Sequence, residues 1–173
     1  FSARPHDPPA TVVTRIRQGL RALSPVSPKT MPAHLAARLP EPLLEAWRAL
    51  DPYDQRHLVA VAEDLEASGQ PDHVVLAGLL HDIGKVGRIT IVDRVALVLL
   101  GRLAPQVRER LAARSRPLPG LNGLHLLLRH ADTGANLLER AGMPADVVWL
   151  VRHHEQPTEH PDLRRLLAAD QRH

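Results

Sequence analysis

The sequence predicts an all-α fold, and three observations support this. From Leu43 onward, apolar residues recur at the three- and four-residue spacing of helices. Proline, glycine and capping residues separate these segments. No stretch shows the alternation of apolar and polar residues that is typical of strands. With 173 residues, 44% of them hydrophobic, the chain can bury the core of one domain. We expect about seven to nine helices.

The first 42 residues are predicted to form a proline-rich, basic extension, and residues 43–173 the domain. Within the extension, residues 11–23 have apolar residues at helical spacing with arginines between them. This pattern predicts a short amphipathic helix. Two interpretations stay open: a solvated appendage, or a helix that binds a partner or a membrane surface.

The helices of the domain are predicted from their start and stop signals. Residues 43–50 form a first apolar face, and Asp51 caps a helix that begins at Pro52 and ends near Gly69. The buried helix begins after Pro71. Further helices are expected at residues 91–103, 105–114, 130–141 and 144–154, and from a cap at Asp162 onward, with residues 115–123 as a loop.

Polar residues follow directly on the most apolar helix. Residues 74–80 are apolar on every side, and they run into His81, Asp82 and, one turn later, Lys85. Buried polar groups are costly unless they are paired, and a His-Asp doublet suits a divalent metal. Because the chain has no cysteine, any metal must be held by imidazole and carboxylate groups.

Four more polar residues lie on or beside the apolar faces of other predicted helices: His57, His130, His154 and Asp170. Taken singly, each histidine is as well explained as a hydrogen-bonded core residue, and Asp170 as the partner of an arginine. Because each lies on a different helix, one central pocket could collect them all, as metal sites in helical bundles do.

The order of these residues resembles the HD superfamily of metal-dependent phosphohydrolases. The resemblance covers residues 43–173 and implies a single helical HD-type domain around a metal pocket. The positions that carry it are His57, the doublet His81-Asp82 within His-Asp-Ile-Gly-Lys, His130, the pair His153-His154, and Asp170.

The resemblance also implies roles. Asp82 bridges two metals in members that bind a pair of ions, and Lys85 faces the substrate phosphate, so we expect both to be catalytic. The implied first ion is held by His57, His81, Asp82 and Asp170, and the second by Asp82, His130 and His154, with His153 as a further candidate ligand. Such ligands suit one or two divalent ions of Fe, Mn, Zn, Co or Ni, and do not choose among them.

The expected activity is hydrolysis of a phosphoester or phosphoanhydride in a small, nucleotide-like substrate by metal-activated water. The Gly-Tyr-Pro signature of members that cleave cyclic dinucleotides is missing after residues 153–155. The short step from His154 to Asp170 is similar to compact two-metal members that hydrolyse diadenosine tetraphosphate. The alternatives are a non-catalytic, metal- or nucleotide-binding regulatory domain and a di-iron oxygenase.

Composition argues against two other classes of protein. The net charge is only +3, the charges are interspersed, and four aromatic residues offer little for base stacking, so we expect no specific binding of nucleic acid. No apolar stretch approaches the ~20 residues of a membrane-spanning helix. We therefore expect a cytoplasmic protein.

Overall fold

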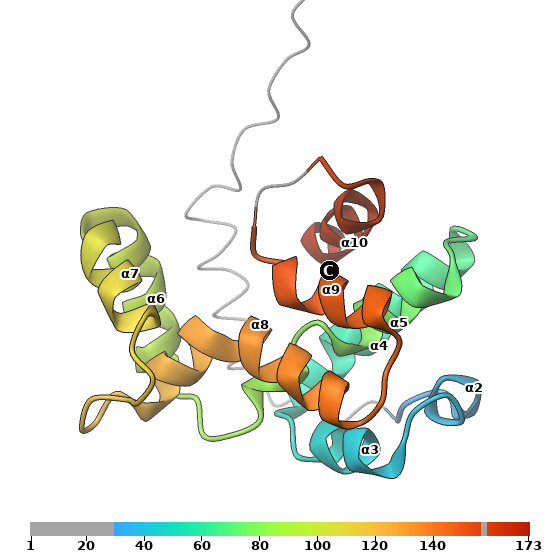
Figure 1. The fold of residues 1–173 in the computed structure, drawn as a ribbon, viewed down its shortest axis with the longest axis horizontal. Coiled ribbons are helices and arrows are strands. Elements are labelled where there is room, and N and C mark those ends of the chain that lie inside the picture. Colours follow the sequence, from blue (N-terminus) through green and yellow to red (C-terminus); the bar gives the residue numbers. More distant parts are fainter. Residues whose placement is uncertain (1–29, 157–158) are drawn as a thin grey trace, which may run out of the picture.

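The computed structural model describes residues 30–156 and 159–173, and these form a helical bundle without strands (Figure 1). This confirms the predicted fold class. The described residues contain nine α-helices and one 3₁₀ helix, η1. They are α2 (Ala33–Ala36), α3 (Glu41–Arg48), α4 (Pro52–Ala67), α5 (Asp72–Leu80), η1 (Ile83–Lys85), α6 (Ile91–Leu103), α7 (Pro105–Ala112), α8 (Asn122–Arg140), α9 (Ala145–His153) and α10 (Pro161–Arg172).

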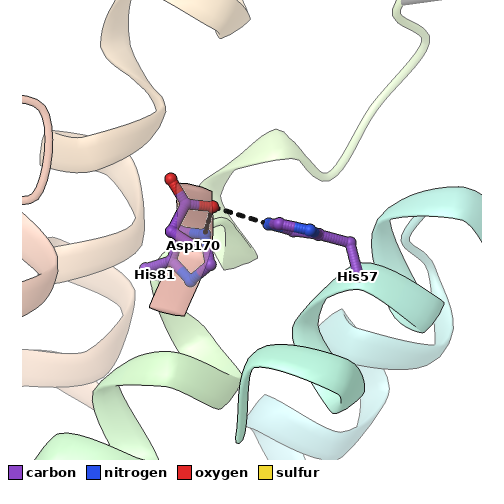
Figure 2. Close-up of side chains that lie close together, drawn as sticks. All are labelled: His57, His81 and Asp170. Carbon is purple, nitrogen blue, oxygen red and sulfur yellow. Dashed lines mark ion pairs between the residues drawn. The ribbon is translucent and has the colours of Figure 1, made fainter. Parts of the chain in front are cut away.

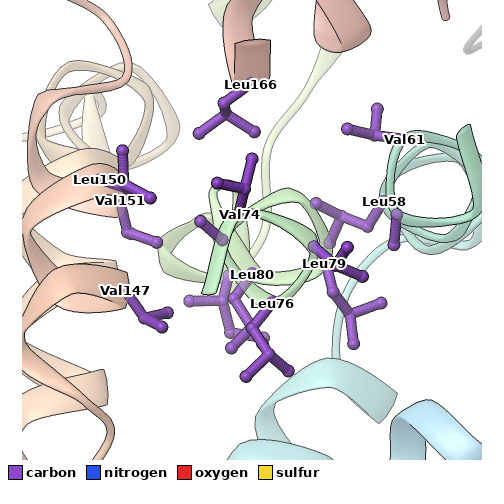
Figure 3. Close-up of a cluster of buried hydrophobic side chains, with 14 of the residues drawn as sticks. Leu58, Val61, Val74, Leu76, Leu79, Leu80, Val147, Leu150, Val151 and Leu166 are labelled. Atoms are coloured by element: carbon purple, nitrogen blue, oxygen red, sulfur yellow. The ribbon is translucent and has the colours of Figure 1, made fainter. Parts of the chain in front are cut away.

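Helix α5 is the centre of the fold. Residues 74–80 are all buried, as expected of a helix that is apolar on every side. Helices α4, α9 and α10 pack around it. Figure 3 shows the side chains of α5, among them Leu79 and Leu80, meeting Leu58 of α4 and Val151 of α9. The C-terminal end of this rigid helix presents His81 and Asp82.

Helix α8 crosses the bundle and contacts η1, α6 and α9. Its contact with η1 depends on two glycines. A Cβ atom on Gly84 would lie 2.0 Å from the carbonyl oxygen of His130 and 2.6 Å from the backbone nitrogen of Gly134. The missing side chains let the two backbones approach this closely, and the approach sets where His130 lies relative to Asp82.

Most helix starts follow the sequence signals. Asp51 accepts a hydrogen bond from the Tyr53 backbone nitrogen at 2.9 Å, as a capping residue should. Thr90 and Asp93 form a reciprocal capping box at the start of α6. The predicted cap at Asp162 is wrong, because α10 begins one residue earlier and Asp162 accepts from His73 of α5 instead.

The start of α8 also differs from the prediction. The helix begins at Asn122, inside the stretch expected to be a loop, so His130 lies in the middle of the helix and not near its start. The reason is tertiary. A Cβ atom on Gly123 would meet the Asp93 carboxylate at 2.3 Å, so this glycine serves a close contact with α6 and does not break the helix.

The described part of the predicted N-terminal extension packs against the domain. Met31, Leu35 and Leu39 belong to the same buried cluster as Leu43 of α3. The predicted amphipathic helix at residues 11–23 lies outside the described residues. The division at residue 42 stays a prediction, but the residues just before it contribute to the core.

Candidate metal centre

Six side chains predicted as metal ligands gather into two adjoining groups. The first group contains His57, His81 and Asp170, and the second contains Asp82, His130 and His154. Within each group, one potential ligand atom per residue lies within 4.8 Å of the others. We call the first group cluster A and the second cluster B.

Cluster A joins three helices. His57 comes from α4, His81 ends α5 and Asp170 comes from the last turns of α10. The Oδ1 atom of Asp170 lies 2.9 Å from His57 Nε2, the contact dashed in Figure 2, and 3.4 Å from His81 Nε2. One carboxylate oxygen therefore faces the Nε2 atoms of two imidazoles.

Cluster B is formed on the other side of the His-Asp doublet. Asp82 precedes η1, His130 lies in α8 and His154 follows α9 directly. Asp82 Oδ1 is 3.2 Å from His130 Nε2 and 3.7 Å from His154 Nε2. All three side chains are buried.

Asp82 connects the two clusters. Its Oδ1 atom faces cluster B, and its Oδ2 atom lies 3.7 Å from His81 Nε2 in cluster A. Lys85 also contacts Oδ2 through its ammonium group. One carboxylate thus offers a separate oxygen to each cluster, which is one of the arrangements in which a carboxylate can bridge two ions.

The histidines are held with their Nε2 atoms pointing inward. The Nδ1 atoms of His81, His130 and His154 lie 2.7–3.0 Å from the carbonyl oxygens of residues 78, 127 and 151, each three residues earlier in the chain. Because a carbonyl oxygen can only accept, each Nδ1 must carry the hydrogen. In the neutral imidazole, Nε2 then presents its lone pair to the pocket.

This arrangement fits a cation. The Nε2 atoms of His130 and His154 are only 3.1 Å apart, so two lone pairs would repel unless a proton or a metal ion lies against them. Imidazoles oriented by backbone carbonyls, together with carboxylates, are common ligands of transition metals. The residues present therefore match the donor set that the resemblance implies.

Electrostatics keep both carboxylates ionised. Burial raises the pKa of Asp82, but the charges of Lys85 and His81 outweigh it and hold that pKa well below its usual range. Asp170 is affected in the same way: burial raises its pKa, and hydrogen bonds from His57 and His81 lower it by more. Metal ligation requires these ionised forms.

His81 and His154 differ in charge near pH 7, since the first is mainly protonated and the second is neutral. Burial lowers the pKa of His81, but the nearby carboxylates of Asp82 and Asp170 raise it to about 8. Burial and the positive charge of His81 lower the pKa of His154 to about 3. Without a metal, His154 is therefore neutral near pH 7, and its Nε2 atom is an acceptor.

His153 is the one predicted ligand that the structure places in neither cluster. Its Nδ1 atom lies 2.7 Å from the carbonyl oxygen of Trp149, and its ring stacks on the Trp149 indole with 4.4 Å between centroids. The neighbouring His154 occupies the pocket because it continues the apolar face of α9.

One pair of functional interest was not anticipated. Asp54 of α4 is 2% exposed and forms an ion pair of 3.1 Å with Arg94 of α6. The pair lies close to the clusters, since Asp54 precedes His57 by one helical turn. The signal available in the sequence was a carboxylate three residues before a candidate ligand, on the same side of a predicted helix.

The fold and the six gathered side chains define a class: an all-helical, HD-like domain with a buried His/Asp pocket that could bind metal. Comparison with family models is more specific, because the HDOD domain model matches residues 58–157, more than half of the chain. The chain belongs to the HDOD domain family. No curated protein and no solved structure matched it.

This family is related to, but is not the same as, the HD phosphohydrolase superfamily that the motifs resemble. The matched range contains His81, Asp82, His130 and His154, but it leaves out His57 and Asp170. Cluster B is therefore covered by the family match, and cluster A is completed by residues on either side of it. Across the described residues, no helix has both the length and the apolar character to cross a membrane.

Proposed function

We propose that this domain is a metal-dependent phosphohydrolase that acts on a small, nucleotide-like phosphoester or phosphoanhydride. The observation that supports it most strongly is the position of Asp82. This buried carboxylate directs one oxygen at the histidines of cluster B and the other at His81 of cluster A. A hydrogen-bonded core would not need six potential ligands in this arrangement.

In this proposal each cluster holds one ion. Cluster A with Asp82 would bind the first, and cluster B the second, with Asp82 shared. A pair of divalent ions there would supply a Lewis acid for a phosphoryl oxygen and a water molecule with a lowered pKa. The protein supplies fixed ligands, because each inward Nε2 atom of His81, His130 and His154 is oriented by a backbone carbonyl.

Lys85 is the residue proposed to meet the substrate. Its side chain is 15% exposed and lies on the 3₁₀ helix directly after the doublet. Burial lowers the pKa of Lys85, but the charges of Asp82 and Asp54 outweigh it and leave the pKa raised. The ammonium group is therefore charged at neutral pH and can stabilise negative charge on a phosphoryl oxygen.

A second function, a non-catalytic regulatory domain, is favoured by the same lysine. The Lys85 ammonium contacts Asp82 Oδ2, the oxygen that would face the first ion. A fixed cation at this position could neutralise the carboxylate without a metal. The two functions therefore differ in whether metal ions or Lys85 balance the charge of Asp82.

Metal analysis and activity assays separate them. The protein is purified with and without air, its metal content is measured by mass spectrometry, and a panel of nucleotides and dinucleoside polyphosphates is assayed with Mn²⁺ or Fe²⁺. We expect bound metal and hydrolysis of at least one compound. In His81→Ala the hydrolysis should be lost and the metal content should fall. The matched control is His153→Ala, which changes a histidine outside the clusters. Turnover of no phosphoester by the metal-loaded wild-type protein would sink the phosphohydrolase proposal.

A further inference from the structure

A cavity of about 290 Å³ adjoins the candidate metal centre. It is formed by the loop before α4, the first turn of α4, the residues that follow η1, and the start of α6. The charged side chains that line it are Lys85, Arg88, Arg94, Asp51 and Asp54. Nothing in the proposed chemistry of the two clusters accounts for the two arginines or for the buried Asp54.

The cavity is connected to the clusters through side chains that belong to both. Lys85 lines the cavity and contacts Asp82, the carboxylate shared by the clusters. On the other wall, Asp54 lies one helical turn before His57 of cluster A. Lys85 and Asp54 therefore each link the cavity to a residue of the clusters. The cavity lies beside the site where a phosphoryl group would react.

The charges of the cavity suit an anion. Asp54 is 2% exposed and is already paired with Arg94, at 3.1 Å from one terminal nitrogen. This contact fixes the guanidinium and leaves its other N–H groups available. Arg88 is exposed, and within the described part of the chain no carboxylate lies within ion-pair distance of it.

Asp51, the other acidic residue that lines the cavity, does not cancel the positive charge of the two arginines. Asp51 uses Oδ1 to accept from the Tyr53 backbone nitrogen, and it is exposed at the edge of the cavity. Arginine presents a planar set of donors that matches phosphate oxygens two at a time. The volume, near the lower end of the range of about 300–1,000 Å³ for ligand pockets, is ample for a phosphate group.

We propose that this cavity is the subsite for a second phosphate group of the substrate, held by Arg88 and Arg94, with Asp54 positioning Arg94. This rests on the proposed phosphohydrolase function and narrows its substrate class to polyphosphorylated compounds such as nucleoside polyphosphates. The group that reacts lies at the clusters, and the neighbouring phosphate lies in the cavity.

The test uses inorganic triphosphate as the probe and the full chain loaded with metal. Calorimetric titration compares the wild-type protein with Arg88→Gln and Arg94→Lys. The lysine keeps a positive charge beside buried Asp54, so the variant does not leave that carboxylate without a partner. Arg102→Gln is the matched control, because Arg102 is an exposed arginine on the same helix, outside the cavity lining.

We expect the Kd for triphosphate to rise about tenfold or more in Arg88→Gln, the loss typical of a hydrogen bond to a charged group, and severalfold in Arg94→Lys. Arg102→Gln should bind as the wild type does. Metal content is measured before and after titration, so that removal of metal by triphosphate is detected equally in all four proteins. Equal Kd values in all four would overturn the proposed subsite.

A second assay separates this result from the proposed function. Bis(p-nitrophenyl) phosphate has only one phosphate, so its hydrolysis by the metal-loaded wild-type protein reports the phosphohydrolase activity without involving the cavity. Hydrolysis of this ester together with equal triphosphate binding would overturn the subsite and keep the phosphohydrolase. Arginine-dependent binding of triphosphate without hydrolysis of any phosphoester would overturn the phosphohydrolase and support an anion site.

Discussion

The Nε2 atoms of His130 and His154 lie 3.1 Å apart, although both imidazoles use their Nδ1 hydrogen to reach a backbone carbonyl. If both rings are neutral and each Nδ1 carries its hydrogen, the lone pairs of the two Nε2 atoms point at each other. A cation between or beside them removes the repulsion, so cluster B should bind a metal ion independently of cluster A.

The first prediction follows from this separation. His154→Ala should remove the ion of cluster B and leave that of cluster A, because His57, His81 and Asp170 are untouched. Metal content per chain, measured by mass spectrometry, should fall from two ions to one. His153→Ala, one residue away and outside both clusters, should keep both. An identical metal content in His154→Ala and the wild type would contradict the assignment.

The second prediction concerns metal removal. A ligand that binds only the folded chain, at a concentration 100 times its Kd, raises the free energy of unfolding by about 2.7 kcal/mol. For a domain of this size, that corresponds to a rise in Tm of roughly 5–10 °C. Thermal unfolding should therefore show a higher Tm with Mn²⁺ than after chelation.

The control for this shift is Asp82→Asn. It keeps the shape of the side chain but removes the charge shared by both clusters. We expect its Tm to be the same with Mn²⁺ and with chelator. A metal-dependent Tm of equal size in this variant would mean that the ion binds elsewhere on the chain.

Much of the fold could be predicted from residues that act locally. Pro52 and Pro105 mark helix starts because their effect depends on neighbours in sequence. The start of α8 could not be predicted in this way. Gly123 allows α8 to pack closely against Asp93, which lies thirty positions earlier in the chain. Short-range signals do not report such contacts.

The same distinction applies to the site. Helical periodicity indicated that His154, in register with Val147 and Val151, would point inward, and it does so while His153 stacks on Trp149. The pairing of Asp54 with Arg94 joins residues 40 positions apart. The spacing of Asp54 and His57 indicates that they share a side of the helix, but it does not indicate that Arg94 is the partner of Asp54. Only the packing of α6 against the bundle brings them together.

The third prediction tests the contact between η1 and α8. In Gly84→Ala, the added Cβ would lie 2.0 Å from the His130 carbonyl oxygen, so the backbones must separate. We expect the free energy of unfolding to fall by about 3 kcal/mol, the upper range for overpacking. Chemical denaturation measures this change, and metal affinity at cluster B should fall with it.

Gly101→Ala is the comparison, because the nearest atom to its added Cβ is the Arg108 side chain at an ordinary 3.8 Å. Since this glycine lies inside α6, alanine there should stabilise the protein by about 0.5–1 kcal/mol. Equal effects of the two substitutions would argue against the close approach of η1 and α8.

The fourth prediction concerns pH and the capping box of α6. Burial raises the pKa of Asp93, but hydrogen bonds from the Thr90 side chain and backbone outweigh it, and the pKa lies below its ordinary value. A carboxylate with a lowered folded pKa contributes stability above its unfolded pKa, near 3.9. This contribution is lost as the pH falls through the folded pKa.

Asp93→Asn should therefore lower the free energy of unfolding by on the order of 1 kcal/mol between pH 5 and 7, the difference between a hydrogen bond to a charged acceptor and one to a neutral acceptor. The difference from the wild type should shrink below pH 4, as Asp93 becomes protonated. Denaturant titrations at a series of pH values measure it. Glu109→Gln, at an exposed position on α7, is the matched control. A difference that stays constant down to pH 2 would contradict the role of the ionised carboxylate.

The contact of Gly84 with α8 also gives a criterion for recognising other chains with this centre. The separation of Asp82 and His130 depends on two glycines, 50 positions apart, that let two backbones touch. A related sequence that keeps every histidine and aspartate but carries a larger residue at the position of Gly84 would hold the same ligands too far apart for one carboxylate to serve both groups. Screening for metal-binding members of the family should therefore use this glycine pair together with the ligands.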